Sequence, residues 1–210
     1  GLIEHEWIGQ TYLSTCGWNV LETIVDIRPR MGGSDGEKEA QKRVERAFRE
    51  AGLHDIDYHT FDMPGWERGC SSLTLQTPVE AELDCIALPG TPSASLSGEV
   101  VHLGHGLPRD FEATDVEGKL VVCRSDVPDW YDHWMHRREK YGLAIEHGAA
   151  GFIFANHVPG CLPPTGSLGG GMDVIGPMPG IGISMEAGER IARYAQKGPV
   201  EASIDIEADI

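Results

Sequence analysis

Three stretches in the second half of the chain decide the fold. Residues 110–124 read DFEATDVEGKLVVCR, residues 140–154 read KYGLAIEHGAAGFIF, and residues 178–188 read MPGIGISMEAG. Each contains a short apolar run bounded by glycine, serine or proline, which is typical of buried strands in an α/β (α+β) domain. We expect Gly118 to allow a tight turn before a strand, Gly148 to end a helix, and Ser184 to cap the next helix. Gly151 is expected to let the preceding helix pack close to the strand that follows.

Further elements are expected on both sides of these stretches. Short strand patterns occur at residues 72–77, 81–88, 98–103, 119–124, 150–155, 180–183 and 200–206. Helices are predicted over about residues 132–147 and 184–196. Between Asn156 and Pro179 lies a long connection rich in glycine and proline, and long connections of this kind tend to be functional or mobile. Its triple glycine, residues 169–171, lacks the strand-before, helix-after setting of a nucleotide fingerprint and is interpreted as loop.

The first third of the chain has a helical character. Residues 2–27 predict one or two short helices, with a break at residues 14–17. Ser34 and Glu37 form a capping-box pattern, which predicts a helix up to Ala51 that ends at Gly52. One stripe of this helix is apolar: Ala40, Val44, Ala47, Phe48 and Ala51. Residues 56–61 alternate apolar and polar side chains and predict a strand. Pro64 and Gly65 then predict a boundary between an N-terminal segment, residues 1–63, and a second domain, residues 64–210.

Composition excludes several classes of function. The 210 residues include 33 acidic and 17 basic side chains, so the formal net charge is −16. This charge argues against a nucleic-acid partner and against an anionic membrane surface. No apolar run reaches the length of about 18 residues that a membrane-spanning helix needs, and no secretion signal opens the chain, so a cytoplasmic location is expected. Because only five of the basic residues are lysine, we expect a halophilic, archaeal-like host and a fold that weakens at low salt.

The residues that could carry chemistry form no convincing constellation. The five cysteines are odd in number and none has C-x-x-C spacing, so free thiols are expected, with a Cys70–Cys85 pair left open. His133 and His136, near Asp129 and Asp132, could bind zinc, but a solvated helix start is favoured. The pair His102 and His105 is interpreted as a strand end running into a turn. The zinc-binding pattern H-E-x-x-H does not occur, and no catalytic or metal-binding residue is predicted.

The three stretches quoted above resemble, in the same order, the sequence units of protease-associated (PA) domains. The residues that carry the resemblance are Asp115, Gly118, Lys119, Lys140, Gly148, Gly151, Pro179 and Ser184. The resemblance implies a PA-domain β-barrel or sandwich with flanking helices, preceded by an N-terminal helical segment and strand.

The N-terminal segment resembles the start of zinc aminopeptidases that carry a PA insert, including glutamate carboxypeptidase-type and transferrin-receptor-type proteins. The shared features are Arg28, the Gly33-Ser34 loop, and the helix and strand that follow. In that family the ligands of two catalytic zinc ions come after the PA domain. The resemblance therefore implies a leading segment plus a PA domain that stops before the chemistry. No cofactor is expected in this chain, and two zinc ions are expected in the parent peptidase.

The leading functional hypothesis is a non-catalytic PA-domain fragment that covers an active site, shapes substrate access or mediates assembly. Residues 127–138 and 159–179 are predicted to face the cleft. They offer aromatic anchors and cations for a peptide terminus or an acidic side chain: Trp130, Tyr131, Trp134, Arg137 and Arg138. The expected partners are the missing catalytic domain, peptide substrates and, through the apolar stripe at Val44, a second copy of the chain. Two alternatives stay open: a stand-alone peptide-binding PA module, and a small hydrolase that uses His133, His136 and Asp129.

Overall fold

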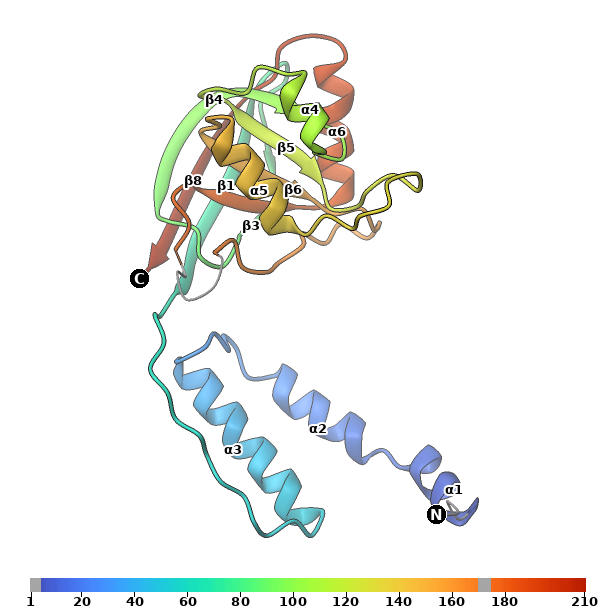
Figure 1. Ribbon diagram of the computed structural model, residues 1–210. Helices are drawn as coiled ribbons and strands as arrows, with labels where there is room; N and C mark the ends of the chain where they lie inside the picture. The colour runs from blue at the N-terminus through green and yellow to red at the C-terminus, as the bar shows by residue number, and fades with distance from the viewer. Residues whose placement is uncertain (1–4, 170–174) are drawn as a thin grey trace. The chain divides into compact units, whose positions relative to one another are not determined.

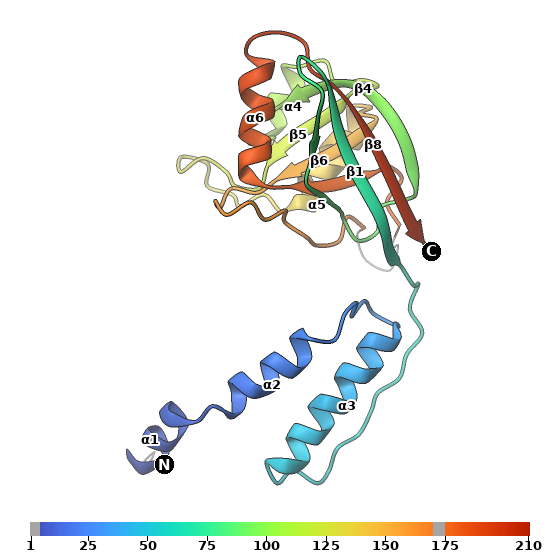
Figure 2. The ribbon, with the colours of Figure 1, turned by 180° about the vertical axis from the view of Figure 1, so that it is seen from behind.

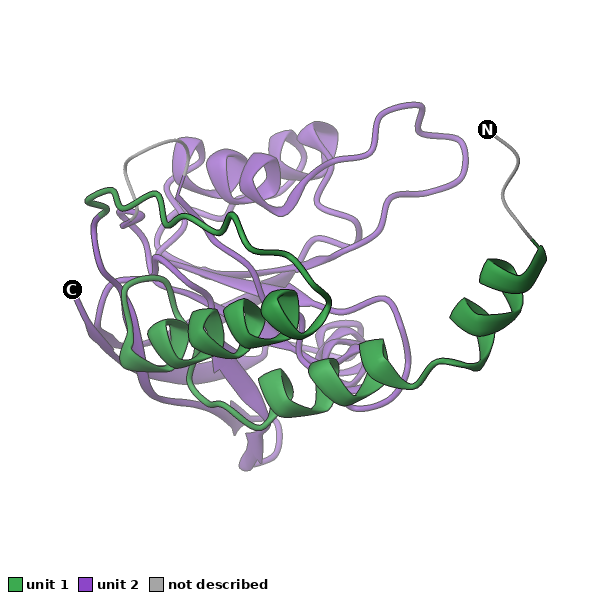
Figure 3. Ribbon diagram, turned by 90° about the horizontal axis from the view of Figure 1, so that it is seen from below, with its two compact units in different colours: residues 1–63 green, residues 64–210 purple. Residues whose placement is uncertain are grey.

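The chain divides into two compact units. The computed structural model describes residues 5–169 and 175–210. Unit 1 is Gly1–Met63 and unit 2 is Pro64–Ile210 (Figure 3). Each unit is described by itself.

Unit 1 consists of three helices followed by an irregular segment. The helices are α1 (His5–Leu13), α2 (Cys16–Val25) and α3 (Asp35–Glu50), so the predicted break near residues 14–17 is confirmed. Ser34 caps α3, because its hydroxyl accepts a hydrogen bond of 3.2 Å from the Glu37 amide. The Glu37 carboxylate accepts from the Gly33 amide, which replaces the reciprocal bond of the predicted capping box. Gly52 ends the helix with a φ of +88°.

The prediction of a strand at residues 56–61 is wrong. These residues have no regular secondary structure and run alongside α3 (Figures 1 and 2). Tyr58 donates a hydrogen bond of 2.9 Å to the Glu45 carboxylate. Within the described part of unit 1, no backbone amide of residues 54–63 donates to a backbone carbonyl. A strand requires a second strand to bond, and the described part of unit 1 supplies none.

Unit 1 lacks a core of its own. Ser34 is the one buried residue among residues 5–63. Large apolar side chains are exposed on all three helices, from 38% for Val25 to 88% for Tyr12. A helix with an apolar stripe is stabilised mainly by packing that stripe against another element.

Unit 2 is built on one eight-stranded sheet in the order β2-β1-β8-β4-β5-β6-β7-β3. Its strands are β1 (Glu67–Thr77), β2 (Ala81–Leu83), β3 (Cys85–Ala87), β4 (Ala94–His102), β5 (Leu120–Arg124), β6 (Gly151–Ala155), β7 (Gly180–Ile183) and β8 (Glu201–Asp209). Neighbours from β4 to β7 are parallel, and all other pairs are antiparallel. The two ends of the sheet approach each other, since Arg68 Nε donates to Ala87 O at 2.9 Å and Ala87 N donates to Ser71 Oγ at 3.1 Å. The sheet is therefore a nearly closed barrel, as the resemblance implied.

Three helices flank this barrel: α4 (Pro108–Glu112), α5 (Arg137–Glu146) and α6 (Met185–Ala195). Tyr141 and Ala144 of α5 pack in one core cluster with Phe152 and Phe154 of β6. Gly188 of α6 lies against Ala155, which points to the other face of that strand. Helices α5 and α6 therefore cover opposite faces of the parallel strands (Figures 1 and 2).

Several predicted elements of unit 2 differ in their limits. The strand expected over residues 81–88 is split at Asp84 into β2 and β3. Helix α5 begins at Arg137 rather than near residue 132, because His136 is its N-cap. Helix α4 was not predicted; Pro108 opens it, and Asp110 accepts a hydrogen bond of 2.9 Å from the Leu107 amide. None of the described helices has the length and apolarity needed to cross a membrane.

The explanation given for Gly151 is also wrong. A Cβ atom at this position would lie 2.8 Å from Leu120 of β5 and 3.3 Å from Leu96 of β4. The close approach is therefore to leucine side chains of neighbouring strands and not to the preceding helix.

Candidate functional site

The parallel strands bring three connecting segments to one edge of the barrel. Residues 103–107, 125–136 and 156–179 follow the carboxyl ends of β4, β5 and β6. We call the described parts of these segments the loop edge. Ser125 Oγ and His157 Nδ1 lie 2.7 Å apart, so the second and third segments are in contact.

One face of α5 holds the loop edge in place. Arg137 donates through Nε and Nη2 to the Ser167 carbonyl at 3.1 and 2.9 Å. Lys140 donates through Nζ to the carbonyl oxygens of Arg124, the last residue of β5, and of Asp126, each at 2.7 Å. The Tyr141 hydroxyl donates to Met178 O at 2.6 Å and accepts from Met178 N at 3.0 Å. Spacings of three and four place these side chains on one helix face. We call Arg137, Lys140 and Tyr141 the α5 bracket.

Lys140 is a structural cation. It is completely buried, and this burial lowers the pKa of its ammonium group. Cys123 lies beside it on β5, and burial raises the pKa of the Cys123 thiol to about 12. A thiol with so high a pKa stays protonated near neutral pH and is a poor nucleophile. The pair therefore fixes the start of the second segment and does not form a reactive centre.

An arginine–carboxylate ion pair lies at the end of β5. Arg124 donates to Asp126 through two parallel bonds of 2.9 Å, and His105 Nδ1 lies 3.2 Å from Asp126 Oδ1. Burial alone would raise the pKa of Asp126, but the hydrogen bonds and charge of Arg124 outweigh it and lower that pKa. This bidentate geometry orients the turn that begins the second segment.

The predicted aromatic residues lie at the surface of the loop edge. Trp130 and Trp134 are 57% and 59% exposed. The Arg109 guanidinium lies over the Trp130 ring, 4.3 Å from its centroid, and Tyr131 meets Trp130 edge-on at 5.8 Å. Trp134 lies edge-on to His157 at 6.3 Å. The structure thus divides the predicted aromatic group into two parts.

The two predicted arginines are engaged with the third segment. Arg137 also donates to the Thr165 carbonyl at 3.3 Å, and Arg138 donates to the Ser167 hydroxyl. Their binding of a peptide stays a prediction. Of the predicted segment 159–179, residues 170–174, which include part of the triple glycine, lie outside the described residues.

The residues of the PA-like motif stabilise turns and helix ends. Lys119 pairs with Asp115 at 3.6 Å. Gly118 and Gly148 have φ values of +71° and +74°, and the Gly118 amide donates to the Gly148 carbonyl at 2.8 Å. The Pro179 carbonyl accepts from Phe152 N at 2.9 Å, and Ser184 Oγ accepts from Ala187 N at 3.2 Å.

Two residues that shape the third segment were missed by the sequence analysis. Asn156 Oδ1 accepts from the amides of His157 and Val158 at 2.9 and 3.2 Å. Glu186 accepts from the amides of Gly160 and Cys161 at 2.9 and 3.1 Å. Asparagine at a strand end is a recognisable turn signal. Glu186 lies 26 residues after Gly160, so no local pattern indicates its role.

The histidines near α5 act as helix-end groups. The His136 ring accepts from Arg138 N at 3.2 Å, and His133 Nε2 lies 2.7 Å from Glu139 Oε2. Across residues 5–169 and 175–210, no three His, Cys, Asp or Glu side chains are placed to hold a metal ion. All five cysteines are free, so the Cys70–Cys85 pair is not formed.

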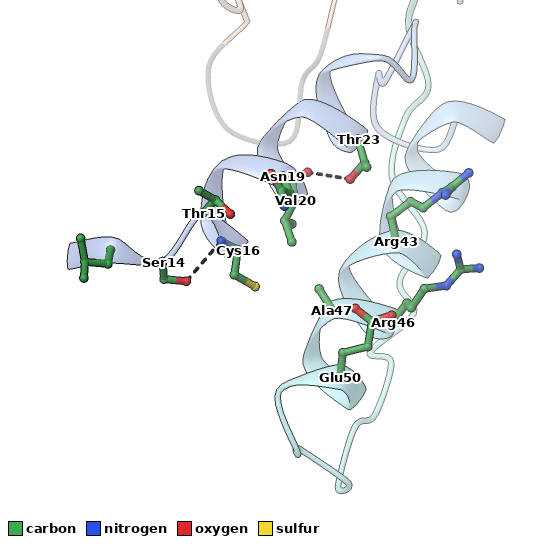
Figure 4. A pocket seen from close by; sticks show the side chains of 11 residues that line it. Ser14, Thr15, Cys16, Asn19, Val20, Thr23, Arg43, Arg46, Ala47 and Glu50 are labelled. Atoms are coloured by element: carbon green, nitrogen blue, oxygen red, sulfur yellow. Dashed lines mark hydrogen bonds between the residues drawn. The ribbon is translucent and has the colours of Figure 1, made fainter. Parts of the chain in front are cut away.

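Unit 1 contains a groove between α2 and α3 with a volume of about 650 Å³ (Figure 4). Helix α2 contributes Cys16, Asn19, Val20 and Thr23, while α3 contributes Arg43, Arg46, Ala47 and Glu50. The groove combines polar and apolar groups without a nucleophile–base pair. It is consistent with two helices that lack a third packing partner.

Comparison with known proteins defines the class of unit 2. Residues 96–191 match the PA domain family. The chain is 23% identical over 183 residues to carboxypeptidase Q of Rattus norvegicus, covering 85% of this chain and 39% of the relative. It is 24% identical over 184 residues to the probable leucine aminopeptidase 2 of Aspergillus oryzae, covering 87% and 34%. The chain therefore carries a PA domain and is related to carboxypeptidase Q and aminopeptidases.

Solved structures show the same fold. A peptidase M28 precursor from Shewanella amazonensis superimposes with a TM-score of 0.73 at 21% identity, covering 96% of this chain and 48% of that one. A zinc aminopeptidase from Bacillus subtilis gives a TM-score of 0.64 at 23% identity, covering 92% and 43%. These likenesses show that the chain shares the fold of the corresponding part of these peptidases. The chain spans less than half of the length of these relatives.

Proposed function

We propose that unit 2 is a non-catalytic accessory domain of a zinc-dependent aminopeptidase, in which the loop edge faces the substrate cleft and shapes peptide access. The observation that carries this proposal is the exposure of Trp130 and Trp134 on a segment whose start is hydrogen-bonded to Lys140 of the α5 bracket. Exposed aromatic side chains on a rigid scaffold are typical of recognition surfaces, since little order is lost on binding. The names of the relatives supply the class of substrate, which is peptides.

Unit 1 is, in this proposal, the leading part of the peptidase domain. Its apolar stripes are only partly covered within the described part of the unit, and the backbone amides of residues 54–63 donate to no backbone carbonyl there. Both features are expected of a segment whose core and sheet partners belong to another part of the protein. A second copy of the chain, docked through Val44 and Phe48, is the competing partner.

Zinc is not assigned to any residue of this chain. The described residues bring no suitable set of three ligands together, so they do not fit a catalytic zinc site. No reaction step is derived from them.

The proposal is tested with the 210-residue chain and with the product of its gene extended downstream of Ile210. We expect no hydrolysis of aminoacyl p-nitroanilides or short peptides by the chain with added Zn²⁺, and hydrolysis by the extended product. In the extended product, Trp134→Ala should raise KM for peptides with little change in kcat, because it removes uniform binding. Val79→Ala, at an exposed apolar residue between β1 and β2, is the matched control. Equal effects of both variants would refute the cleft-facing role.

The alternative is a stand-alone PA module that binds peptides without an attached peptidase. The same exposed indoles support it. It predicts a stop codon directly after Ile210 and peptide binding by the chain alone.

A further inference from the structure

Four of the large apolar side chains exposed in the described part of unit 2 belong to two segments of the loop edge that contact each other. They are Trp130 and Trp134 after β5, and Val158 and Leu162 after β6, with exposures between 51% and 68%. The Trp134–His157 contact and the Ser125–His157 hydrogen bond join the two segments. We call these four residues the loop-edge patch. Clustered apolar exposure of this kind marks an interaction surface.

The patch is preorganised. On its β6 side, the Asn156 side chain accepts hydrogen bonds from two backbone amides and donates to Leu162 O at 3.0 Å. The Glu186 carboxylate accepts hydrogen bonds from two further amides between Val158 and Leu162. On its β5 side, Arg109 stacks on Trp130 and His133 pairs with Glu139. A partner that docks here loses little free energy to ordering of the protein.

The charges around the patch indicate the sign of the partner. Asp129 and Asp132 are exposed, alternate with the two tryptophans along residues 129–134, and form no ion pair with any described residue. The nearby cations are already directed elsewhere. Arg137 and Arg138, at the start of α5, donate to Thr165 and Ser167. Arg109 Nε lies 3.7 Å from Asp110 Oδ1. The β6 side carries no Asp, Glu, Lys or Arg between residues 156 and 169.

Indole faces beside free carboxylates are suited to an organic cation. The Arg109–Trp130 stack shows that one of these rings already holds a guanidinium at 4.3 Å. Trp134 has no such cation among the described residues. A lysine or arginine side chain would gain cation–π attraction from Trp134 and charge attraction from Asp129 and Asp132, while its aliphatic stem covers Val158 or Leu162.

We propose that the loop-edge patch binds a polypeptide segment that carries a basic side chain next to apolar residues. This inference rests on the proposed function, because it assumes that the loop edge faces a peptide. The sequence analysis expected the arginines to bind an acidic side chain of the peptide, whereas the patch is expected to bind a basic one. The bound cation is a lysine or arginine side chain. Binding of a free peptide amino terminus is a separate outcome of the test.

The test uses the 210-residue chain and blocked peptides, acetylated and amidated, that differ only in a central Lys or Glu between leucines. Indole N–H signals of Trp130 and Trp134 report binding by NMR. We expect millimolar binding of the Lys peptide and about tenfold weaker binding of the Glu peptide, because two exposed charge pairs and one cation–π contact are each modest. The preference should shrink in molar KCl.

Matched variants separate the contributions. Trp134→Ala should reduce the Lys preference and weaken the binding of both peptides. The double variant Asp129→Asn/Asp132→Asn should reduce the preference without weakening the Glu peptide, and Val79→Ala should change neither. Equal or tighter binding of the Glu peptide overturns this inference while leaving the peptide-facing role intact. Binding that requires a free amino terminus also overturns it. The absence of binding by either peptide at millimolar concentration contradicts both this inference and the proposed function.

Discussion

The two units of this chain have similar amphipathic helix sequences, but their apolar side chains are buried in unit 2 and largely exposed in unit 1. In unit 2, Phe152, Tyr141 and Ala144 lie in a closed core, and every strand except β2 and β3 at the ends of the sheet pairs with a strand on both sides. In unit 1, α3 has an equally clear amphipathic sequence, yet Phe48 on its apolar stripe is 46% exposed. Amphipathic periodicity therefore predicts where a helix forms, while only the presence of a partner decides whether its stripe is buried. We infer that unit 2 is the cooperative folding unit and that unit 1 requires another part of the protein.

Substituting one phenylalanine in each unit gives the largest contrast. Phe152→Ala removes a fully buried ring that packs on Tyr141 and Phe154, and it should lower the free energy of unfolding by about 4 kcal/mol. Phe48→Ala should change it by less than about 0.5 kcal/mol, because nearly half of the side chain is exposed and unit 1 has no closed core. Urea titration followed by circular dichroism measures both. A large loss for Phe48→Ala would mean that unit 1 has a core in solution.

Removing the buried lysine should have the next largest effect. Lys140→Met leaves the carbonyls of Arg124 and Asp126 without their donor, so we expect a loss of about 2 kcal/mol in the free energy of unfolding. Lys42→Met on α3, where the lysine is exposed, is the control and should be neutral. A more stable Lys140→Met variant would show that the desolvation of the ammonium outweighs its two hydrogen bonds.

Glycines with positive φ sharpen the comparison further. Gly118→Ala forces a side chain into a φ of +71° with no neighbouring atom within 4 Å, so backbone strain alone should cost about 1 kcal/mol. Gly52→Ala places the same strain at φ +88° in unit 1. If unit 1 lies outside the cooperative transition, Gly52→Ala leaves the urea midpoint unchanged. Equal shifts of the urea midpoint for both variants would show that the two units unfold in one cooperative transition.

A pH effect on α5 is the smallest prediction. Burial, together with the charges of Arg137 and Arg138, lowers the pKa of His136 below its usual 6.5. The folded state therefore favours the neutral ring that caps α5, and the stabilisation is complete above pH 6.5 and lost as the pH falls through the lowered pKa. Amide exchange of Arg138, corrected for its intrinsic pH dependence, should show reduced protection in that range. In His136→Asn, whose cap does not titrate, the protection should stay constant.

The sequence predicted the elements whose causes are local. Ser184, Gly118 and Gly148 have the cap or turn conformations expected of their residue types, and the apolar runs of β5 to β7 are strands at nearly the expected limits. Long-range causes escaped prediction. The alternation at residues 56–61 is typical of a strand, but a strand also needs a partner, which the described part of unit 1 does not provide.

The candidate site shows the same limit. The exposed indoles of Trp130 and Trp134 followed from residue type and loop composition. Arg137 was predicted to contact a ligand, but the carbonyl that holds its guanidinium lies 30 residues away in sequence. Only the fold could show that this arginine braces the loop edge.

Hydrogen exchange of the intact 210-residue chain, read by mass spectrometry, tests the central claim most directly. We predict that amides of β4 to β8 exchange slowly and together, while those of α1 to α3 and residues 54–63 exchange within the earliest time points. Slow exchange of α3 and residues 54–63 that matches that of the barrel in dilute, monomeric chain would contradict the account. It would show that unit 1 is stably folded without a further partner.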